Sequence, residues 1–315
     1  MKPRFLAIFL LLPAVYVVVH AAQTGAAVQI RHDAAAKQYA VTIGGKPFTT
    51  YRYGPEFPDK PVFYPVMSPN GARVNREFPM VDKVPGESND HPHHQSVFFT
   101  YDEVNGIHFW NPDTSGRRIA PREAKVDGQA LVALLDWKDK AGGVVLEETK
   151  RVTFGGAADV FWMDHDITLT AKIPVTFGDT KEGAFGIRLN DTLKEAGGSG
   201  HYINADGLEG GAVWGKTSAW VAIRGAVKDA SGDHDVTVAI FAHPAGVNFP
   251  PYWHARDYGL FAANPFGRKA YDPAAPERTM TLATGESLRV RFRLSVYSGK
   301  VEKTRLERDF ASGSK

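Results

Sequence analysis

Short stretches of alternating apolar and polar residues, divided by glycine-rich turns, restrict this chain to a β-sheet fold. The clearest stretches are residues 131–137, 144–154 and 160–170. Alternation with a period of two puts successive side chains on opposite faces of a strand, and glycine pairs between the stretches favour turns. Stretches of the same kind lie at residues 28–50, 185–189, 219–223, 236–241 and 288–297.

Helical patterning is confined to one short segment near the end of the chain. Residues 301–310 have the spacing of an amphipathic helix. Many short strands, frequent Gly and Pro turns and almost no helix predict an all-β fold, a large antiparallel β-sandwich. No fixed-period repeat is visible, which disfavours propellers and solenoids. We expect residues 22–315 to form a single β-sandwich domain with a short C-terminal helix.

The first 21 residues have the pattern of a cleavable export signal. Lys2 and Arg4 precede an apolar run over residues 5–19, and small residues follow at the cleavage positions. We therefore expect a periplasmic or secreted protein. No later segment approaches about 18 consecutive apolar residues, so we expect no membrane span once the signal is removed. The chain has no cysteine, which excludes a lipid-anchored lipoprotein and any disulfide.

Charge and motif content exclude several classes of function. Loss of Lys2 and Arg4 with the signal lowers the basic count from 37 to 35, equal to the 35 acidic residues. A neutral balance without a basic run argues against nucleic acid as a partner. The sequence contains no glycine-rich nucleotide motif, no Gly-x-Ser-x-Gly and no His-Glu-x-x-His, and without cysteine it has no thiol nucleophile or thiolate metal site.

Three histidines follow one carboxylate in the segment Asp90-His91-Pro92-His93-His94. Histidine has an ordinary pKa near neutrality, so this density suits proton transfer or metal binding. If Pro92 keeps the segment extended, His91 and His93 point to one face and His94 to the other. We therefore expect His91 and His93 to be the working pair and His94 to be the more structural member.

Two further segments combine charges, aromatic rings and turn residues. Lys181-Glu182-Gly183 precedes Arg188 on an alternating stretch, and this set would supply a carboxylate with cations to tune it. Residues 252–258 alternate aromatic rings with polar groups in a proline-stiffened region, a composition that suits the binding of a sugar ring. Asn264, in the turn-like Asn264-Pro265-Phe266-Gly267, faces either a ligand or its own turn.

These segments, in this order, resemble the bacterial PmoA-like family, also catalogued as DUF6807. The resemblance implies an all-β sandwich like that of galactose mutarotase, in a family found among bacterial glycan-degradation proteins. Methane oxidation, which the label suggests, is rejected because it needs several spanning helices. The chain has Gln95 where the family commonly has Arg, which removes one contact for an anionic substrate. The matching residues include Arg76-Glu77-Phe78-Pro79, Asp90-His91-Pro92-His93-His94-Gln95-Ser96, Asp179-Thr180-Lys181-Glu182-Gly183, His243-Pro244, Trp253-His254-Ala255-Arg256-Asp257-Tyr258 and Asn264-Pro265-Phe266-Gly267.

The leading hypothesis is an enzyme that cleaves a glycoside or a keto-glycoside, by hydrolysis or elimination, with a His/Glu acid-base site. Its alternatives are a mutarotase-like sugar epimerase and a non-catalytic glycan-binding protein. The expected catalytic residues are His91, His93, Glu182 and His254. The expected saccharide-binding residues are Arg76, Asp90, His94, Lys181, Arg188, Tyr252, Trp253, Arg256 and Asn264. The sequence indicates no definite cofactor, and a divalent metal ion held by His91, His93 and His254 is a further alternative.

Overall fold

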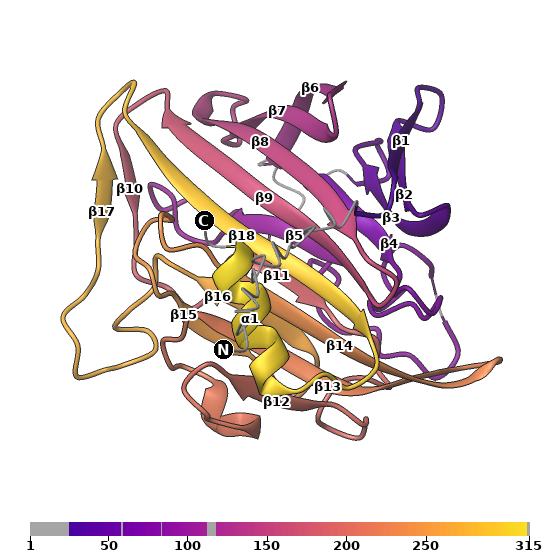
Figure 1. Ribbon diagram of the computed structural model, residues 1–315. Coiled ribbons are helices and arrows are strands. Elements are labelled where there is room, and N and C mark those ends of the chain that lie inside the picture. Colours follow the sequence, from indigo (N-terminus) through magenta and orange to yellow (C-terminus); the bar gives the residue numbers. More distant parts are fainter. Residues whose placement is uncertain (1–24, 58, 83, 112–117, 314–315) are drawn as a thin grey trace, which may run out of the picture.

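Two eight-stranded antiparallel sheets face each other in the computed structural model, which describes residues 25–57, 59–82, 84–111 and 118–313 (Figure 1). The all-β antiparallel sandwich predicted from the sequence is therefore confirmed. The expected signal, residues 1–21, lies outside the described residues. The first sheet, called sheet A, has the strand order β1 (Val28–Asp33), β2 (Gln38–Ile43), β3 (Lys46–Arg52), β4 (Val62–Val66), β5 (Val97–Tyr101), β11 (Gly183–Arg188), β16 (Leu260–Asn264) and β15 (Tyr252–Ala255).

The second sheet, called sheet B, contains the long alternating stretches of the sequence. A two-stranded ribbon pairs β10 (Val175–Phe177) with β17 (Met280–Leu282), and a short 3-10 helix, η1, spans Gly210–Val213. The order of strands in sheet B is β12 (His201–Asn204), β13 (Trp220–Asp229), β14 (Gly232–Ala242), β18 (Ser287–Ser298), β9 (Val160–Ala171), β8 (Val144–Gly156), β7 (Ala130–Lys138) and β6 (Arg118–Asp127).

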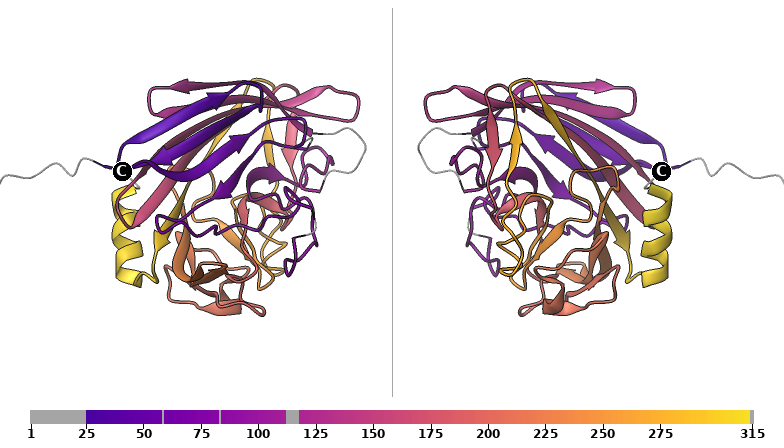
Figure 2. Two further views of the ribbon diagram at one scale, coloured as in Figure 1. Left: turned by 90° about the vertical axis from the view of Figure 1, so that its right-hand side faces the viewer. Right: turned by 90° about the vertical axis from the view of Figure 1, so that its left-hand side faces the viewer.

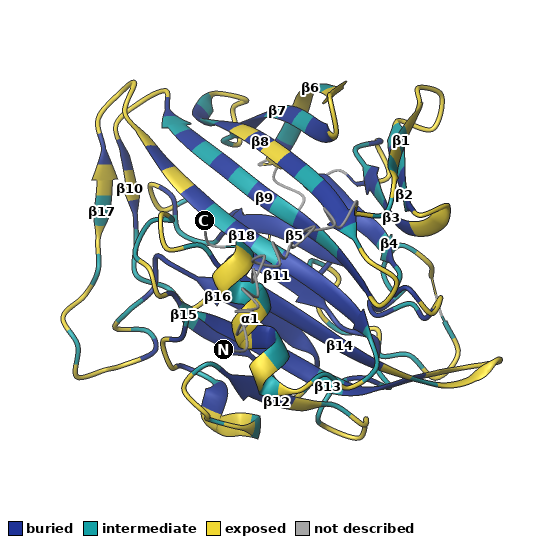
Figure 3. Cartoon of the chain, viewed as in Figure 1, coloured by how far each residue is buried: buried dark blue, intermediate teal, exposed yellow. Residues whose placement is uncertain are grey.

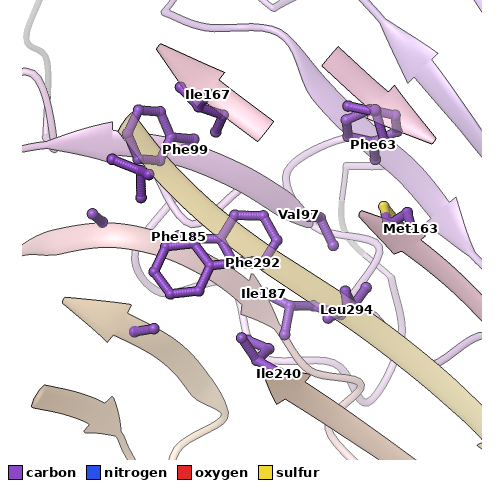
Figure 4. Close-up of a cluster of buried hydrophobic side chains, with 14 of the residues drawn as sticks. Phe63, Val97, Phe99, Met163, Ile167, Phe185, Ile187, Ile240, Phe292 and Leu294 are labelled. Atoms are coloured by element: carbon purple, nitrogen blue, oxygen red, sulfur yellow. The ribbon is translucent and has the colours of Figure 1, made fainter. Parts of the chain in front are cut away.

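The hydrophobic core lies between the two sheets. Side chains of β5 and β11, such as Phe99 and Phe185, meet side chains of β9 and β18, such as Ile167 and Phe292 (Figure 4). Burial alternates residue by residue along β9, as the sequence pattern predicts, whereas β5 and β11 are buried at every position (Figure 3). Strands buried on both faces show that something also covers the outer face of sheet A.

The outer face of sheet B is partly covered by the helix α1 (Lys303–Gly313), which lies where the sequence predicts a helix. Its Leu306 packs with Trp220 and Phe241, and Phe310 lies against the same cluster. Figure 2 shows α1 on one side of the molecule and the loops that follow β4 on the opposite side. Within the ranges that the structure describes, no helix is long and apolar enough to cross a membrane.

The loops between β4 and β5 cover the outer face of sheet A. A separate apolar cluster forms there. It contains residues that alternate along the strands with the core residues and face outward, such as Phe98 and Ala262, and it includes Trp110 from the segment after β5. The predicted histidine segment lies in the loop before β5, and the other predicted segments flank β11 and lie on β15 and β16. Sheet topology therefore brings segments far apart in the sequence onto one face.

Candidate active site

Small residues form the middle of this outer face. The strand register aligns Phe98, Gly186, Ala262 and His254 in one row across β5, β11, β16 and β15. A Cβ atom at Gly186 would lie 2.9 Å from the Cβ of Ala262 and 3.2 Å from a backbone oxygen, so the position accepts only glycine without a local shift. The row therefore has an aromatic ring at one end, an imidazole at the other and a low floor between them.

The histidine segment forms a turn over this floor and is not extended as predicted. His91 has a positive φ of 45°, and its carbonyl accepts a hydrogen bond from the backbone N–H of His94 at 3.0 Å. As a result all three rings are neighbours. His94 lies 4.9 Å from His91 in a stacked pair and 4.3 Å from His93. The sequence analysis expected His94 to point away from His91 and His93. That expectation is wrong, because the turn brings all three rings together.

Asp90 fixes this turn by binding two buried guanidinium groups. Its Oδ1 accepts hydrogen bonds from Arg76 and Arg188, each at 2.6 Å, and its Oδ2 lies 2.8 Å from Nδ1 of His91. Burial would raise the pKa of Asp90, but Arg188, His91 and Arg76 outweigh burial and hold that pKa below its usual value. The carboxylate is therefore an anchor of the turn.

Arg76 has no hydrogen-bonding capacity left for a substrate. Its guanidinium is fully buried and donates to the backbone oxygens of Phe78, Ser88, Asp90 and His91 as well as to the Asp90 carboxylate. The prediction that Arg76 binds saccharide is corrected accordingly: this side chain ties the loop together. Such a network of charge-assisted hydrogen bonds holds an irregular loop in one conformation.

His94 is a neutral hydrogen-bond donor. The Arg188 guanidinium can only donate, so Nδ1 of His94 accepts from it at 3.3 Å and the ring hydrogen is on Nε2. That Nε2 is buried and has no partner among the described residues. Burial, with the neighbouring His93 and Arg188, lowers the pKa of His94 far below its usual value. A buried N–H without an acceptor is costly, so His94 is suited to donate to a ligand oxygen.

His93 is also held neutral, and a buried lysine supports it. Burial, reinforced by Lys60 and His91, lowers the pKa of His93 to about 3. Lys60, which is 1% exposed, donates to the backbone oxygen of His93 at 3.0 Å and lies 5.3 Å from the ring centre of Phe98. Burial lowers the pKa of Lys60 to about 8. The sequence analysis did not single out Lys60, since no local pattern marks it.

At the other end of the row, His254 has a defined tautomer. The carbonyl oxygen of Lys181 can only accept, so Nδ1 of His254 donates to it at 3.0 Å and Nε2 keeps its lone pair. Glu182 Oε2 lies 3.9 Å from the same Nδ1, and its Oε1 accepts from Lys181 Nζ at 2.7 Å. Burial, partly offset by Glu182, lowers the pKa of His254 to about 4. His254 is therefore a neutral base beside a carboxylate.

Tyr258 connects the two ends of the site. Its ring stacks on His91 at 5.1 Å and lies over the guanidinium groups of Arg188 at 4.9 Å and Arg256 at 5.4 Å. Burial raises the pKa of Tyr258, and the two guanidinium groups oppose this rise. Tyr258 is not among the predicted site residues, although it lies in the aromatic segment that the sequence analysis selected.

Two other rings flank the site from separate segments. Trp110 contacts His93 and His94 edge to face at 6.3 and 5.4 Å. Tyr252, a predicted saccharide contact, is half-buried and stacks on Tyr271 at 5.2 Å. The Arg256 guanidinium lies over the rings of Trp214 and Tyr258, and among the described residues no carboxylate pairs with it. Arg256 is therefore a cation with open hydrogen-bonding capacity.

Two of the predicted saccharide contacts have structural roles. Trp253 is fully buried in the core, where its indole N–H donates to the carbonyl of Ser218 at 2.9 Å. The prediction that Trp253 stacks on a sugar is therefore wrong, because in β15 the side chain of His254 faces outward and that of Trp253 faces inward. Asn264 is also fully buried, and its side chain binds the turn that follows and the carbonyl of Thr180. Asn264 thus has the turn role that was one of its two expected roles.

The alternative three-histidine metal site is not assembled. Across the described ranges, no three His, Asp or Glu side chains are grouped so that they could hold a metal ion. His91 binds Asp90 and His254 binds the Lys181 carbonyl, and these two histidines lie at opposite ends of the site. The donor set His91, His93 and His254 therefore does not fit a shared ion.

Comparison with known sequences gives one family. A family model described as "Family of unknown function (DUF6807)" matches residues 38–311. This is the family that the sequence motifs resemble, and its description does not include the PmoA-like label. No curated protein matches the chain.

Similar solved structures match this chain at low identity and with TM-scores below 0.5. A GH36 alpha-galactosidase from Geobacillus stearothermophilus has 10% identity and a TM-score of 0.42, over 86% of this chain and 41% of that chain. A galactose mutarotase-like protein from Clostridium acetobutylicum has 9% identity and a TM-score of 0.37, over 88% and 100%. An aldose epimerase homologue from C. elegans has 11% identity and a TM-score of 0.38, over 87% of this chain and 100% of that chain. The chain thus spans less than half of the galactosidase, and no activity is transferred from these proteins.

Proposed function

This chain belongs to the DUF6807 family, which has no assigned function, and from its site we propose that it is a periplasmic or secreted carbohydrate-active enzyme. The proposed reaction is cleavage of a glycoside or, preferably, of a keto-glycoside. The observation that carries the proposal is the combination on one face of neutral imidazoles, the N–H of His94 that has no partner in the described part of the chain, the guanidinium of Arg256 and the half-buried ring of Tyr258. Aromatic walls with a few convergent polar groups are typical of small-ligand sites.

The protonation states favour elimination next to a carbonyl. His93 and His254 have pKa values of about 3 and 4, so both are neutral bases at working pH. A neutral base removes a proton from carbon only if the resulting enolate is stabilised. The Nε2–H of His94 and the guanidinium of Arg256 supply donors of the required kind. The Asp90 carboxylate, in contrast, is engaged by two arginines and is unsuited to the acid-base role that hydrolysis requires.

The proposed roles follow from this arrangement. His254 accepts the proton through Nε2, and Glu182 stabilises the imidazolium that forms, as a carboxylate beside a catalytic histidine does. The half-buried ring of Tyr258 binds a face of the sugar ring, and Arg188 orients His94.

The test is a substrate panel with matched variants. Purified mature protein is assayed against glycosides and the corresponding 3-keto-glycosides, with product analysis by NMR and detection of an enone by ultraviolet absorbance. We expect cleavage of keto-glycosides by the wild type, and a loss of about 100-fold or more in kcat for His254→Ala and Glu182→Ala. His234→Ala, at the far hairpin of sheet B, should retain full activity because the His234 ring bonds to Asp229 and Ser231 within that hairpin.

The alternatives give different results in the same assay. An epimerase would invert a ring carbon without releasing the aglycone. A hydrolase would cleave the unoxidised glycosides as well, without an enone intermediate. Binding of saccharide without any turnover across the panel would overturn the enzyme and leave a glycan-binding protein.

A further inference from the structure

We propose that Asp102 is a further catalytic residue of this site: it is the acid that protonates the departing oxygen. The proposal rests on the proposed function and concerns a residue that the sequence analysis did not select. It depends on three observations: the position of Asp102 opposite Glu182, its contact with His108, and the need for a proton donor that the neutral histidines do not supply.

Asp102 and Glu182 are cross-strand neighbours. Tyr101 pairs with Gly183 at the end of the β5–β11 ladder, and one step further the backbone N–H of Asp102 donates to the carbonyl of Glu182 at 3.0 Å. Tyr101 faces the core, and alternation along the strand turns Asp102 to the outer face. Residues directly opposite on antiparallel strands have Cβ atoms about 5 Å apart. The two carboxylates therefore lie side by side at one edge of the floor.

Each carboxylate has its own imidazole. Asp102 Oδ1 lies 3.3 Å from Nδ1 of His108, just as Glu182 lies beside His254. The Asp102 side chain is 20% exposed and that of His108 is 56% exposed, so both reach solvent. Phe109, which follows His108, donates its backbone N–H to the carbonyl of Asp102 at 3.2 Å, and this bond fixes the segment beside β5. Two residues after His108, Trp110 contacts His93 and His94. The pair thus adjoins the histidine turn.

The electrostatic setting agrees with a role as acid. Burial raises the pKa of Asp102, the His108 ring opposes this effect, and the carboxylates of Glu182 and Glu103 add to it. Glu182, in contrast, has the ammonium group of Lys181 at 2.7 Å. Two neighbouring carboxylates in different environments commonly divide into a proton donor and an ionised partner. Here Asp102 takes the role of proton donor, and Glu182 is the carboxylate that is paired with Lys181.

With Asp102 as the acid, each proton in the proposed cleavage has a donor and an acceptor. In a keto-glycoside with its ketone two carbons from the glycosidic carbon, His254 Nε2 takes the proton from the carbon between them. The electron pair of that C–H bond forms a C=C bond, and the bond from the glycosidic carbon to the aglycone oxygen breaks. Asp102 gives its proton to that oxygen. The products are an enone and an alcohol, with Asp102 as carboxylate and His254 as imidazolium, and proton transfer through water restores both.

The experiment compares two leaving groups. Wild type and Asp102→Asn are assayed on a methyl keto-glycoside and on the 4-nitrophenyl analogue, whose phenolate departs without protonation. We expect kcat of Asp102→Asn to fall about 100-fold or more on the methyl substrate and to stay within about threefold of wild type on the nitrophenyl substrate. Asp127→Asn, which removes an exposed partner of Arg151 at the edge of sheet B, should match wild type on both.

Each outcome decides a separate point. Equal losses on the two substrates, or full activity of Asp102→Asn on the methyl substrate, would overturn the role of Asp102 while the proposed function stands. Cleavage of neither substrate by the wild type would overturn the proposed function itself. If Asp102→Asn fails to unfold cooperatively, Asp102→Ser replaces it, because this smaller side chain also removes the carboxyl proton donor and should produce the same leaving-group dependence.

Discussion

The guanidinium of Arg188 donates to Nδ1 of His94 at 3.3 Å, and this one contact fixes which nitrogen of a buried histidine carries hydrogen. Arg188 extends from the middle of sheet A, whereas His94 lies in a loop, so the contact joins a rigid strand to an irregular segment. The same guanidinium binds Asp90 and lies under Tyr258. Arg188 thus contacts both the turn and the ring that crosses the site.

Replacement of Arg188 should destabilise the fold strongly. Arg188→Met removes a fully buried guanidinium that donates to Asp90 and His94. Because the Asp90 side chain is 42% exposed and keeps Arg76, we expect a loss of about 1.5–3 kcal/mol, as for a hydrogen bond to a charged group. Arg289→Met is the matched control, since Arg289 pairs with Asp166 on an exposed face, where such pairs contribute about 0–1 kcal/mol. Urea unfolding measures both. Similar small losses in the two variants would contradict the structural role of Arg188.

Stability should fall as the pH drops from 7 toward 4.5. An unfolded histidine binds its proton near pH 6.5, whereas folded His254 and His93 resist protonation down to about pH 4 and 3. The unfolded state therefore binds more protons in this window, and each group contributes at most about 1.4 kcal/mol per pH unit. The free energy of unfolding, measured at several pH values, should fall less steeply in His254→Gln. An unchanged slope in that variant would show that His254 titrates normally in the fold.

Trp253 and Tyr258 should give opposite phenotypes although both belong to the same sequence motif. Trp253→Ala opens a cavity in the core and should cost about 3–5 kcal/mol of stability. Tyr258→Ala removes a half-buried ring above the floor and should weaken saccharide binding much more than it lowers the melting temperature. Calorimetric titration with a non-cleaved substrate analogue, combined with thermal unfolding, separates the two effects. Loss of binding without loss of stability in Trp253→Phe would restore Trp253 as a ligand contact.

Glu182→Gln should lower kcat with little effect on substrate affinity. The amide keeps the size of the side chain but no longer stabilises an imidazolium at His254, so we expect a loss of about 100-fold or more. Lys181→Gln removes only the cation paired with Glu182 on an exposed edge and should have a much smaller effect on kcat. Steady-state kinetics of the two variants on one keto-glycoside measure the difference. A raised KM with unchanged kcat in Glu182→Gln would assign Glu182 to binding alone.

The fold class followed from local pattern, whereas the composition of the site did not. Alternation within 160–170 gives β9 because each strand must bury one face in the core. The same alternation puts the side chains of Trp253 and His254 on opposite faces of the short strand β15. Four residues, however, are too few to show that pattern in the sequence. The histidine turn escaped prediction because its shape depends on Asp90, Arg76 and Arg188, and Arg188 is almost a hundred positions from Asp90.

The pairing of strands is the other feature that the sequence hides. Asp102 meets Glu182 only because β5 and β11 are neighbours in sheet A, and that adjacency depends on long-range packing against sheet B. The motifs around Glu182 and His254 drew attention because charges and rings are dense there. The sequence around Asp102 and Lys60 has no comparable density of charges and rings, and only the fold shows which residues they contact.

Gly186 lies between Phe185 and Ile187, whose side chains form the hydrophobic core, so a single thickness of peptide separates the interior from the floor above. A substitution that shifts β11 by repacking the core would therefore also shift Gly186 and the floor of the site. Substrate preference and thermal tolerance therefore cannot be tuned independently along β11. Divergent relatives should change their chemistry through the surrounding loops and leave this strand nearly constant, which makes it the place to anchor any redesign.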